Sequence, residues 1–307
     1  MPYGDTWRQH RRKFQEGFRD LAQSHRPIQS AKTHELLVNL LRDPNNFRAH
    51  IRTLAAATIF GIVYGHDVAS TNDYFVELAE KAVGALVTQG PLSAAIVNVF
   101  PFMRHLPAWF PGCGFHRTAQ EGRRLLDDMV EKPYAIVVNE IASGTHKTSL
   151  LATYLEQNQI SSGGEEKVLM IKQVCSTTYG AGADTLVSAL ATFFMAMASH
   201  PHAQKKAQEH IDNLIAGEDR LPTWEDRPNL QYIEAVMRET LRYGPVAPLG
   251  FFHSAVRDDV VNGAMTRDPT VYPDPENFIP ERFLKEDGTC NDDDVSFTFG
   301  FGQGFAA

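Results

Sequence analysis

Two stretches decide the fold of this chain: Glu239-Thr240-Leu241-Arg242, and the proline-rich run RDPTVYPDPENFIPERF at residues 267–283. Glu239 and Arg242 stand three residues apart, so on a helix they share one face and can form an ion pair. Such a pair alone is weak evidence, because most are solvated. The proline-rich run offers few backbone N–H groups for regular structure, so it needs side-chain anchors. Arg282 carries a planar guanidinium suited to a buried carboxylate.

The combination of E-x-x-R with R-D-P-x-x-Y-P-D-P and F-x-P-E-R-F resembles the cytochrome P450 family, and the resemblance covers most of residues 1–302. It implies a mostly α fold, a P450-like helical body with a small incomplete β part, as a single domain over residues 1–307. It also implies that Glu239, Arg242 and Arg282 form a salt-bridged structural triad behind a haem.

Helical patterns dominate the rest of the chain, and minor β structure is expected near residues 245–265. The longest helical pattern runs from Glu165 to His200 and stops at Pro201. Its centre reads Ala181-Gly182-Ala183-Asp184-Thr185, where Gly182 would let a flat ligand approach the backbone. The adjacent acid and hydroxyl could relay protons. A glycine-rich packing spot with a capped polar pair explains the same residues.

This pentapeptide resembles the family's A-G-x-D-T motif, which lies in the helix that crosses the distal face of the haem. The resemblance implies that Asp184 and Thr185 are the catalytic residues and manage protons. It implies that Ala181 and Gly182 contact the haem. We therefore expect Asp184 and Thr185 to face a concave apolar pocket that Gly182 lines.

Trp7 and Arg11 stand four residues apart on one face of a basic N-terminal helix. An indole N–H and a guanidinium are both donors suited to a carboxylate, although an amphipathic basic helix explains them too. They match the family's W-x-x-x-R, which implies that they hold a haem propionate. Nearby basic residues, Arg8, Arg12 and Lys13, form a solvated face or help to dock an acidic reductase.

Two further positions concern the haem. His253 matches a weaker propionate-contact position, although a lone histidine is more often a satisfied polar residue. The family's haem loop reads F-x-x-G-x-R-x-C-x-G, and this chain has Phe299 and Gly302 but Gly304 at the arginine position and Ala306 at the cysteine position. A methyl group cannot bind iron, so we expect no metal ligand, and haem (the implied cofactor) would be retained poorly.

The resemblance also indicates an interrupted family member. We expect the N-terminal anchor and first strands to be absent, a gap after Gly263, and the haem-cysteine loop to be cut off. Cys290 lies in a turn rich in Gly and Asp and is a poor substitute ligand. Residues 97–115 are aromatic and apolar, which indicates core or, by the family resemblance, a roof over the substrate channel that touches the membrane.

Composition limits the function classes. The net charge of −8 gives no support to nucleic-acid binding. Three cysteines without C-x-x-C spacing argue against a disulfide framework or a zinc site. No signal peptide stands out, and the longest apolar stretch, 54–65, is too short to cross a bilayer. We therefore expect no transmembrane segment and only peripheral membrane contact.

The family resemblance implies a monooxygenase that inserts one oxygen atom from O2 into a small lipophilic organic substrate, with electrons from an NADPH-dependent reductase. Full-length members would lie on the cytosolic face of the endoplasmic reticulum membrane. Because Ala306 supplies no thiolate, we expect this chain to be inactive. The alternatives are a catalytically dead haem-fold remnant and a helical interaction protein without a cofactor.

Overall fold

The computed structural model describes residues 4–20, 22–68, 73–110, 113–160, 164–248 and 266–299. The chain divides into two compact units, Met1–Asp184 and Thr185–Ala307, and the division falls inside one long helix. Helices make up 74% of the structure, which confirms the mostly α prediction. Each unit is described separately below.

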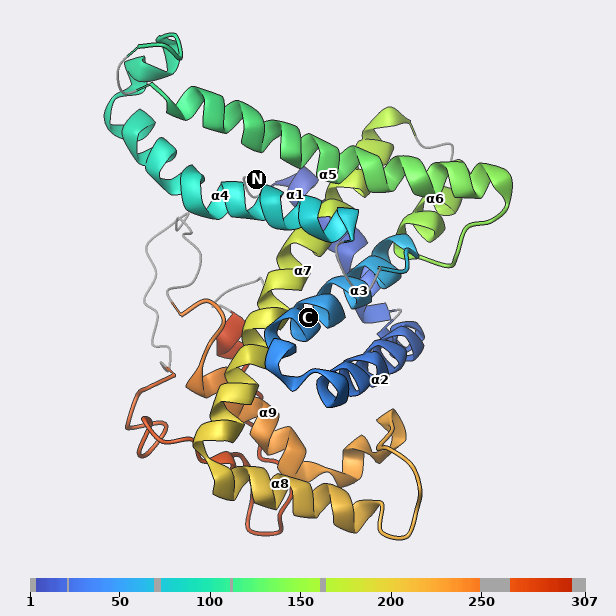
Figure 1. Cartoon of the computed structure of the whole chain (residues 1–307), viewed down its shortest axis with the longest axis vertical. Coiled ribbons are helices and arrows are strands. Elements are labelled where there is room, and N and C mark those ends of the chain that lie inside the picture. Colours follow the sequence, from blue (N-terminus) through green and yellow to red (C-terminus); the bar gives the residue numbers. More distant parts are fainter. Residues whose placement is uncertain are drawn as a thin grey trace. The chain divides into compact units, whose positions relative to one another are not determined.

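Unit 1 is built from helices joined by short turns (Figure 1). Its helices are α1 (Asp5–Gln15), α2 (Arg26–Arg42), α3 (Phe47–Tyr64), α4 (Tyr74–Val99), α5 (Phe115–Ser143), α6 (Leu150–Ile160) and the first part of α7 (Glu165–Ser199). Short helical turns lie at Glu16–Asp20, Ala22–His25, Pro44–Asn46 and Pro101–His105. Two of the helix ends are set by glycine: α3 stops at Gly65 and α5 at Gly144, both in the left-handed region with φ near 70°.

The core of unit 1 is centred on α3, in which every residue from Ala55 to Tyr64 except Ile59 is buried. Phe60 packs edge-on against Tyr179 of α7, with 4.2 Å between ring centroids, and also contacts Phe75 of α4. Cys175 of α7 lies in the same cluster, and burial raises the pKa of its thiol to about 12. Residues of α3, α4 and α7 therefore share one apolar centre, in which α7 packs against α3 on the side that carries Tyr179.

Unit 2 begins with the remainder of α7. It continues through α8 (Pro201–Leu214), η5 (Trp224–Asn229), α9 (Gln231–Tyr243), η6 (Pro280–Phe283) and η7 (Ser296–Phe299). A prolonged irregular segment, 266–299, wraps α9 (Figure 1). The described residues contain no strand, only an isolated antiparallel bridge between Leu284 and Cys290. The expected β structure near 245–265 falls mostly on residues outside the described ranges.

Helix α7 is long and apolar enough, by length and composition alone, to cross a membrane. One such helix is weak evidence, since the core helix of a soluble protein meets the same test.

Candidate functional site

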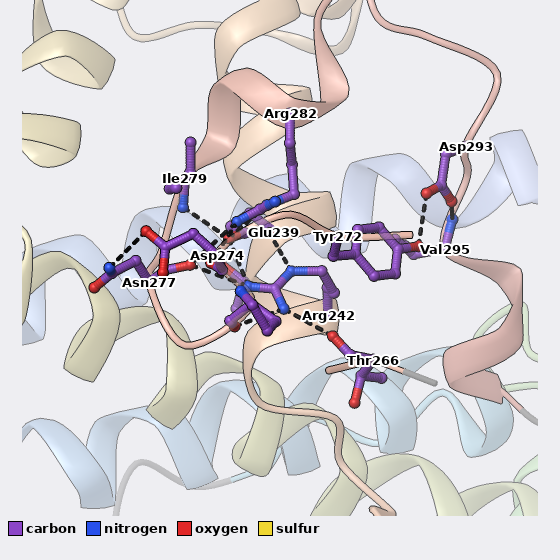
Figure 2. A network of polar contacts seen from close by, with 12 residues as sticks. Glu239, Arg242, Thr266, Tyr272, Asp274, Asn277, Ile279, Arg282, Asp293 and Val295 are labelled. Carbon is purple, nitrogen blue, oxygen red and sulfur yellow. Dashed lines mark hydrogen bonds and ion pairs between the residues drawn. The ribbon is translucent and has the colours of Figure 1, made fainter. Parts of the chain in front are cut away.

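The best-defined polar site in unit 2 is a buried ion-pair network between α9 and the irregular segment (Figure 2). The carboxylate of Glu239 accepts hydrogen bonds from Arg242 Nε at 2.6 Å and Nη2 at 2.8 Å, and the side chains of both residues are 0% exposed. Arg282 Nε approaches the same carboxylate at 3.3 Å, and the backbone N–H of Ile279 donates to it at 2.7 Å. The helix therefore supplies a fork-to-fork pair, and the irregular segment closes over it.

Arg242 uses its remaining donors on backbone carbonyls of the irregular segment. Its Nη1 donates to the oxygens of Thr266 and Pro275 at 2.8 and 2.9 Å, and its Nη2 reaches the oxygen of Asn277 at 3.2 Å. The guanidinium also lies 5.5 Å from the ring centre of Tyr272. A fully buried cation is tolerated only when its donors are satisfied, and five hydrogen bonds satisfy the donors of Arg242.

Arg282 repeats this pattern from the other side of the network. Its Nη1 donates to the oxygen of Pro273 at 2.8 Å, and its Nη2 to the oxygen of Asp274 at 3.2 Å. Asp274 has φ 53°, a left-handed conformation that Asp adopts more readily than most residues. Because prolines remove N–H donors here, the carbonyls have few backbone partners and the two arginines serve as their donors.

The structure thus brings Glu239, Arg242 and Arg282 together, as the sequence analysis expected. That analysis missed two residues that hold the same segment. Tyr272 donates its hydroxyl to Asp293 at 2.6 Å, and Arg238 donates to the carbonyls of Asn291 and Asp293, both at 2.8 Å. Arg238 lies one turn before Arg242, and that spacing was the available signal.

In unit 1, Trp7 and Arg11 lie together on α1, with the guanidinium carbon 5.4 Å from the centre of the indole ring. Both are half-buried. Helix α1 is tied to α7 by His10, whose Nε2 lies 2.9 Å from Oε1 of Gln173. Trp7 and Arg11 therefore lie on a helix that is itself held in place by a contact with α7. Residues that position a ligand need such a fixed helix.

Gly182 of the α7 motif packs closely against α3. A Cβ on Gly182 would lie 3.1 Å from Cδ1 of Ile59, so the missing side chain permits close packing of the two helices. Ala181, Asp184 and Thr185 are exposed. That Asp184 and Thr185 face a concave apolar pocket stays a prediction. Ala181 and Thr185, four residues apart, share one open face of α7.

The aromatic segment that precedes α5 is also more open than a core would be. Val99, Phe100 and Phe102 are exposed, and Trp109 is 76% exposed. The interpretation of residues 97–115 as core is therefore wrong for these side chains. Their exposure agrees with a surface segment, and it makes this stretch the longest run of open aromatic side chains in the described chain.

Three residues of the expected haem site, His253, Gly304 and Ala306, lie outside the described residues. The cysteines that the structure describes do not fit a haem thiolate. Cys113 and Cys175 are buried, and the raised pKa of Cys175 keeps its thiol protonated. Cys290 donates its thiol to the carbonyl of Gln231 at 3.5 Å, and burial raises its pKa as well.

Comparisons with known proteins agree on one family. A family model described as Cytochrome P450 matches residues 1–304. Cytochrome P450 monooxygenase COX2 of Coprinopsis cinerea is 36% identical over 95% of this chain and 59% of its own length. Cytochrome P450 monooxygenase ple1 of Rhodocybe pseudopiperita is 36% identical over 100% of this chain and 62% of its own length. Cytochrome P450 monooxyhenase eriA of Hericium erinaceus is 37% identical over 99% of this chain and 60% of its own length. The chain therefore spans about three fifths of these relatives.

Proposed function

Because the chain belongs to the cytochrome P450 family, we propose that it forms the helical body of a haem-dependent monooxygenase. In that reaction one oxygen atom of O2 is inserted into an organic substrate. The buried Glu239–Arg242–Arg282 network carries the proposal, because it is the feature of the described structure that the family motifs specify most closely. We assign it a structural role, bracing the segment 266–299 against α9.

We assign Trp7 and Arg11 to a haem propionate. Their indole N–H and guanidinium stand on one face of α1 and are suited to a carboxylate. Ala181 would contact the haem, since its side chain lies on the open face of α7, and His253 would be a further propionate contact. Gly182 supports that face indirectly, because its contact with Ile59 sets how closely α7 approaches α3.

Asp184 and Thr185 are the proposed catalytic residues. Their carboxylate and hydroxyl are adjacent in sequence and exposed on α7, so they can exchange protons with water and with each other. A haem, when bound, would supply the oxygen-activating iron. The residues of this chain do not fit a thiolate-bound haem, so we propose no turnover for it.

The same mismatch favours a second candidate, a catalytically dead haem-fold remnant. Its support is Ala306 at the cysteine position of the haem loop, together with Gly304 at the arginine position. A helical interaction protein without cofactor is the more extreme form of this candidate. Both keep the family fold and lose its chemistry.

The proposed partners follow from the family. An NADPH-dependent reductase would supply electrons, and the exposed basic residues Arg8 and Arg12 of α1 offer an acidic partner a contact. The substrate would be a small lipophilic organic molecule. Membrane contact would be peripheral, at the cytosolic face of the endoplasmic reticulum, with the exposed aromatic side chains near Trp109 as the contact surface.

Titration of the chain with hemin, followed by Soret absorbance, tests the haem assignment. We expect weak but saturable binding that Arg11→Ala weakens severalfold, because a propionate loses a charged donor. Arg12→Ala removes an exposed charge from the same helix and should leave the affinity unchanged. The absence of saturable binding, or an equal effect of the two substitutions, would count against the proposed haem site.

A further inference from the structure

A cleft of about 800 Å³ lies between α4 and α5 in unit 1, lined by residues that the proposed site does not use. The two helices run side by side (Figure 1). At one end Lys132 donates to the hydroxyl of Tyr74 at 2.5 Å. Toward the other end a Cβ on Gly122 would lie 3.5 Å from Cβ of Ala85. These two contacts show that the helices are antiparallel and that the cleft follows their length.

The floor of the cleft is apolar and combines leucine side chains with small residues. Leu78 and Ala85 of α4 and Leu125 of α5 line it, together with Gly84 and Gly122. A Cβ on Gly84 would meet nothing within 4 Å, so the absence of a side chain there leaves the space open. On α5 the lining extends from Arg117 to Lys132, about 22 Å along the helix. An elongated apolar trough of this kind suits a single aliphatic chain.

The acids on the rim are already neutralised by neighbouring cations. On α4, Lys81 pairs with Glu77 at 3.3 Å. On α5, Arg124 pairs with Glu121 at 2.8 Å and Lys132 with Asp128 at 3.0 Å. These i,i+3 and i,i+4 pairs are solvated and add little stability, but they leave the rim with no net negative charge of its own.

Arg117 is the remaining cation of the rim. Its side chain is exposed and makes no hydrogen bond or ion pair with another described residue, and Thr118 beside it offers a hydroxyl donor. With four cations and three acids lining the cleft, Arg117 is the surplus positive charge. Arg117 lies at the Gly122 end of the cleft, and Tyr74 lies at the other end. A ligand whose anionic head meets Arg117 would therefore extend its apolar tail along the cleft toward Tyr74.

We propose that this cleft binds a single-chain amphiphilic carboxylate of the fatty-acid class. The tail lies on the floor formed by Leu78, Ala85 and Leu125, and the carboxylate meets Arg117. Polar anions without a tail gain nothing from the floor, and an uncharged tail gains nothing from Arg117. The site is independent of the haem assignment, because none of its lining residues belongs to the proposed haem site.

The test uses laurate on the full chain without added hemin, measured by competition with the fluorescent cis-parinaric acid. Arg117→Ala should weaken laurate about fivefold, the upper end for an exposed charge pair, and should leave dodecanol unchanged. Arg123→Ala, a neighbouring exposed arginine outside the cleft, is the matched control and should change neither. Gly84→Leu fills the floor and should weaken both ligands more than tenfold, with Gly84→Met replacing it if far-UV circular dichroism shows misfolding.

Octanoate, with four fewer methylenes than laurate, should bind more weakly than laurate in the wild-type chain, because each buried methylene contributes up to about fourfold in affinity. Equal effects of Arg117→Ala and Arg123→Ala would overturn the proposal, as would laurate binding that survives the filled floor. If Arg117→Ala weakens binding to phosphatidylglycerol vesicles but leaves laurate unchanged, the cleft faces a membrane and the fatty-acid assignment is wrong.

Discussion

Replacing Arg242 by alanine tests whether the buried network holds unit 2 together. The substitution removes two hydrogen bonds to Glu239 and three to the carbonyls of Thr266, Pro275 and Asn277. It leaves Glu239 fully buried, with only Arg282 at 3.3 Å and one backbone N–H to balance its charge. The folded state is destabilised, because a buried carboxylate that loses its partner keeps an uncompensated charge out of water.

The magnitude follows from the burial of the pair. Glu239 and Arg242 have 0% exposed side chains, so solvent does not screen their interaction. Breaking such a pair costs about 3–5 kcal/mol. If the whole chain unfolds together, that loss lowers Tm by about 5–8 °C, since the unfolding entropy scales with chain length. The Tm would fall further if unit 2 unfolds alone.

Thermal unfolding followed by circular dichroism measures the effect. Arg227→Ala is the matched control, since Arg227 forms an exposed pair with Glu234 near the start of the same helix and should cost about 0.5 kcal/mol or less. Arg242→Lys should recover only part of the loss, because a lysine ammonium cannot reproduce the two-pronged pair. An Arg242→Ala Tm equal to that of Arg227→Ala would refute the reasoning.

Three further predictions follow from other contacts. Gly182→Val should destabilise the fold by about 1–3 kcal/mol in urea denaturation, because a Cβ at position 182 would lie 3.1 Å from Ile59. Adding Ile59→Ala to Gly182→Val should relieve part of that cost. A double variant whose loss of stability equals the sum of the two single losses would contradict the packing role. Hydrogen bonds from Arg220 and Thr223 lower the pKa of Asp226, so its stabilisation is present above the unfolded-state pKa and is lost as pH falls through the lower folded-state value. The stability difference between wild type and Asp226→Asn should therefore shrink below about pH 4, and a difference that stays constant would contradict this prediction. Iodoacetamide at pH 8 should label Cys290 before Cys175, whose thiol is buried and has its pKa raised to about 12, and peptide mapping that finds the reverse order would be inconsistent with the described core.

The buried network was predicted from the resemblance to the family, because the spacing of Glu239 and Arg242 alone is also typical of a solvated pair. The i,i+3 spacing places both residues on one helix face, and a proline-rich segment with few N–H donors favours an anchor such as Arg282. The mostly α class followed from helical periodicity. These features depend on local rules, which a single sequence displays.

What the sequence could not show depends on contacts between distant segments. Gly182 packs against Ile59, which lies more than 120 residues earlier, and no local pattern in the sequence indicates that contact. The exposure of Trp109 likewise depends on what packs nearby, because an apolar run has the same composition in a core and on a surface. The cleft between α4 and α5 arises from the pairing of two helices and has no signature in either one alone.

The most direct test of the central claim is the carbon-monoxide spectrum of the chain reconstituted with hemin and reduced by dithionite. The family fold with alanine at position 306 supplies no thiolate. We therefore expect no red-shifted Soret band of the thiolate type, and we expect that such a band requires at least Gly304→Arg together with Ala306→Cys. A thiolate-type band from the unaltered chain would contradict the account and would identify another cysteine, Cys290 first, as the iron ligand.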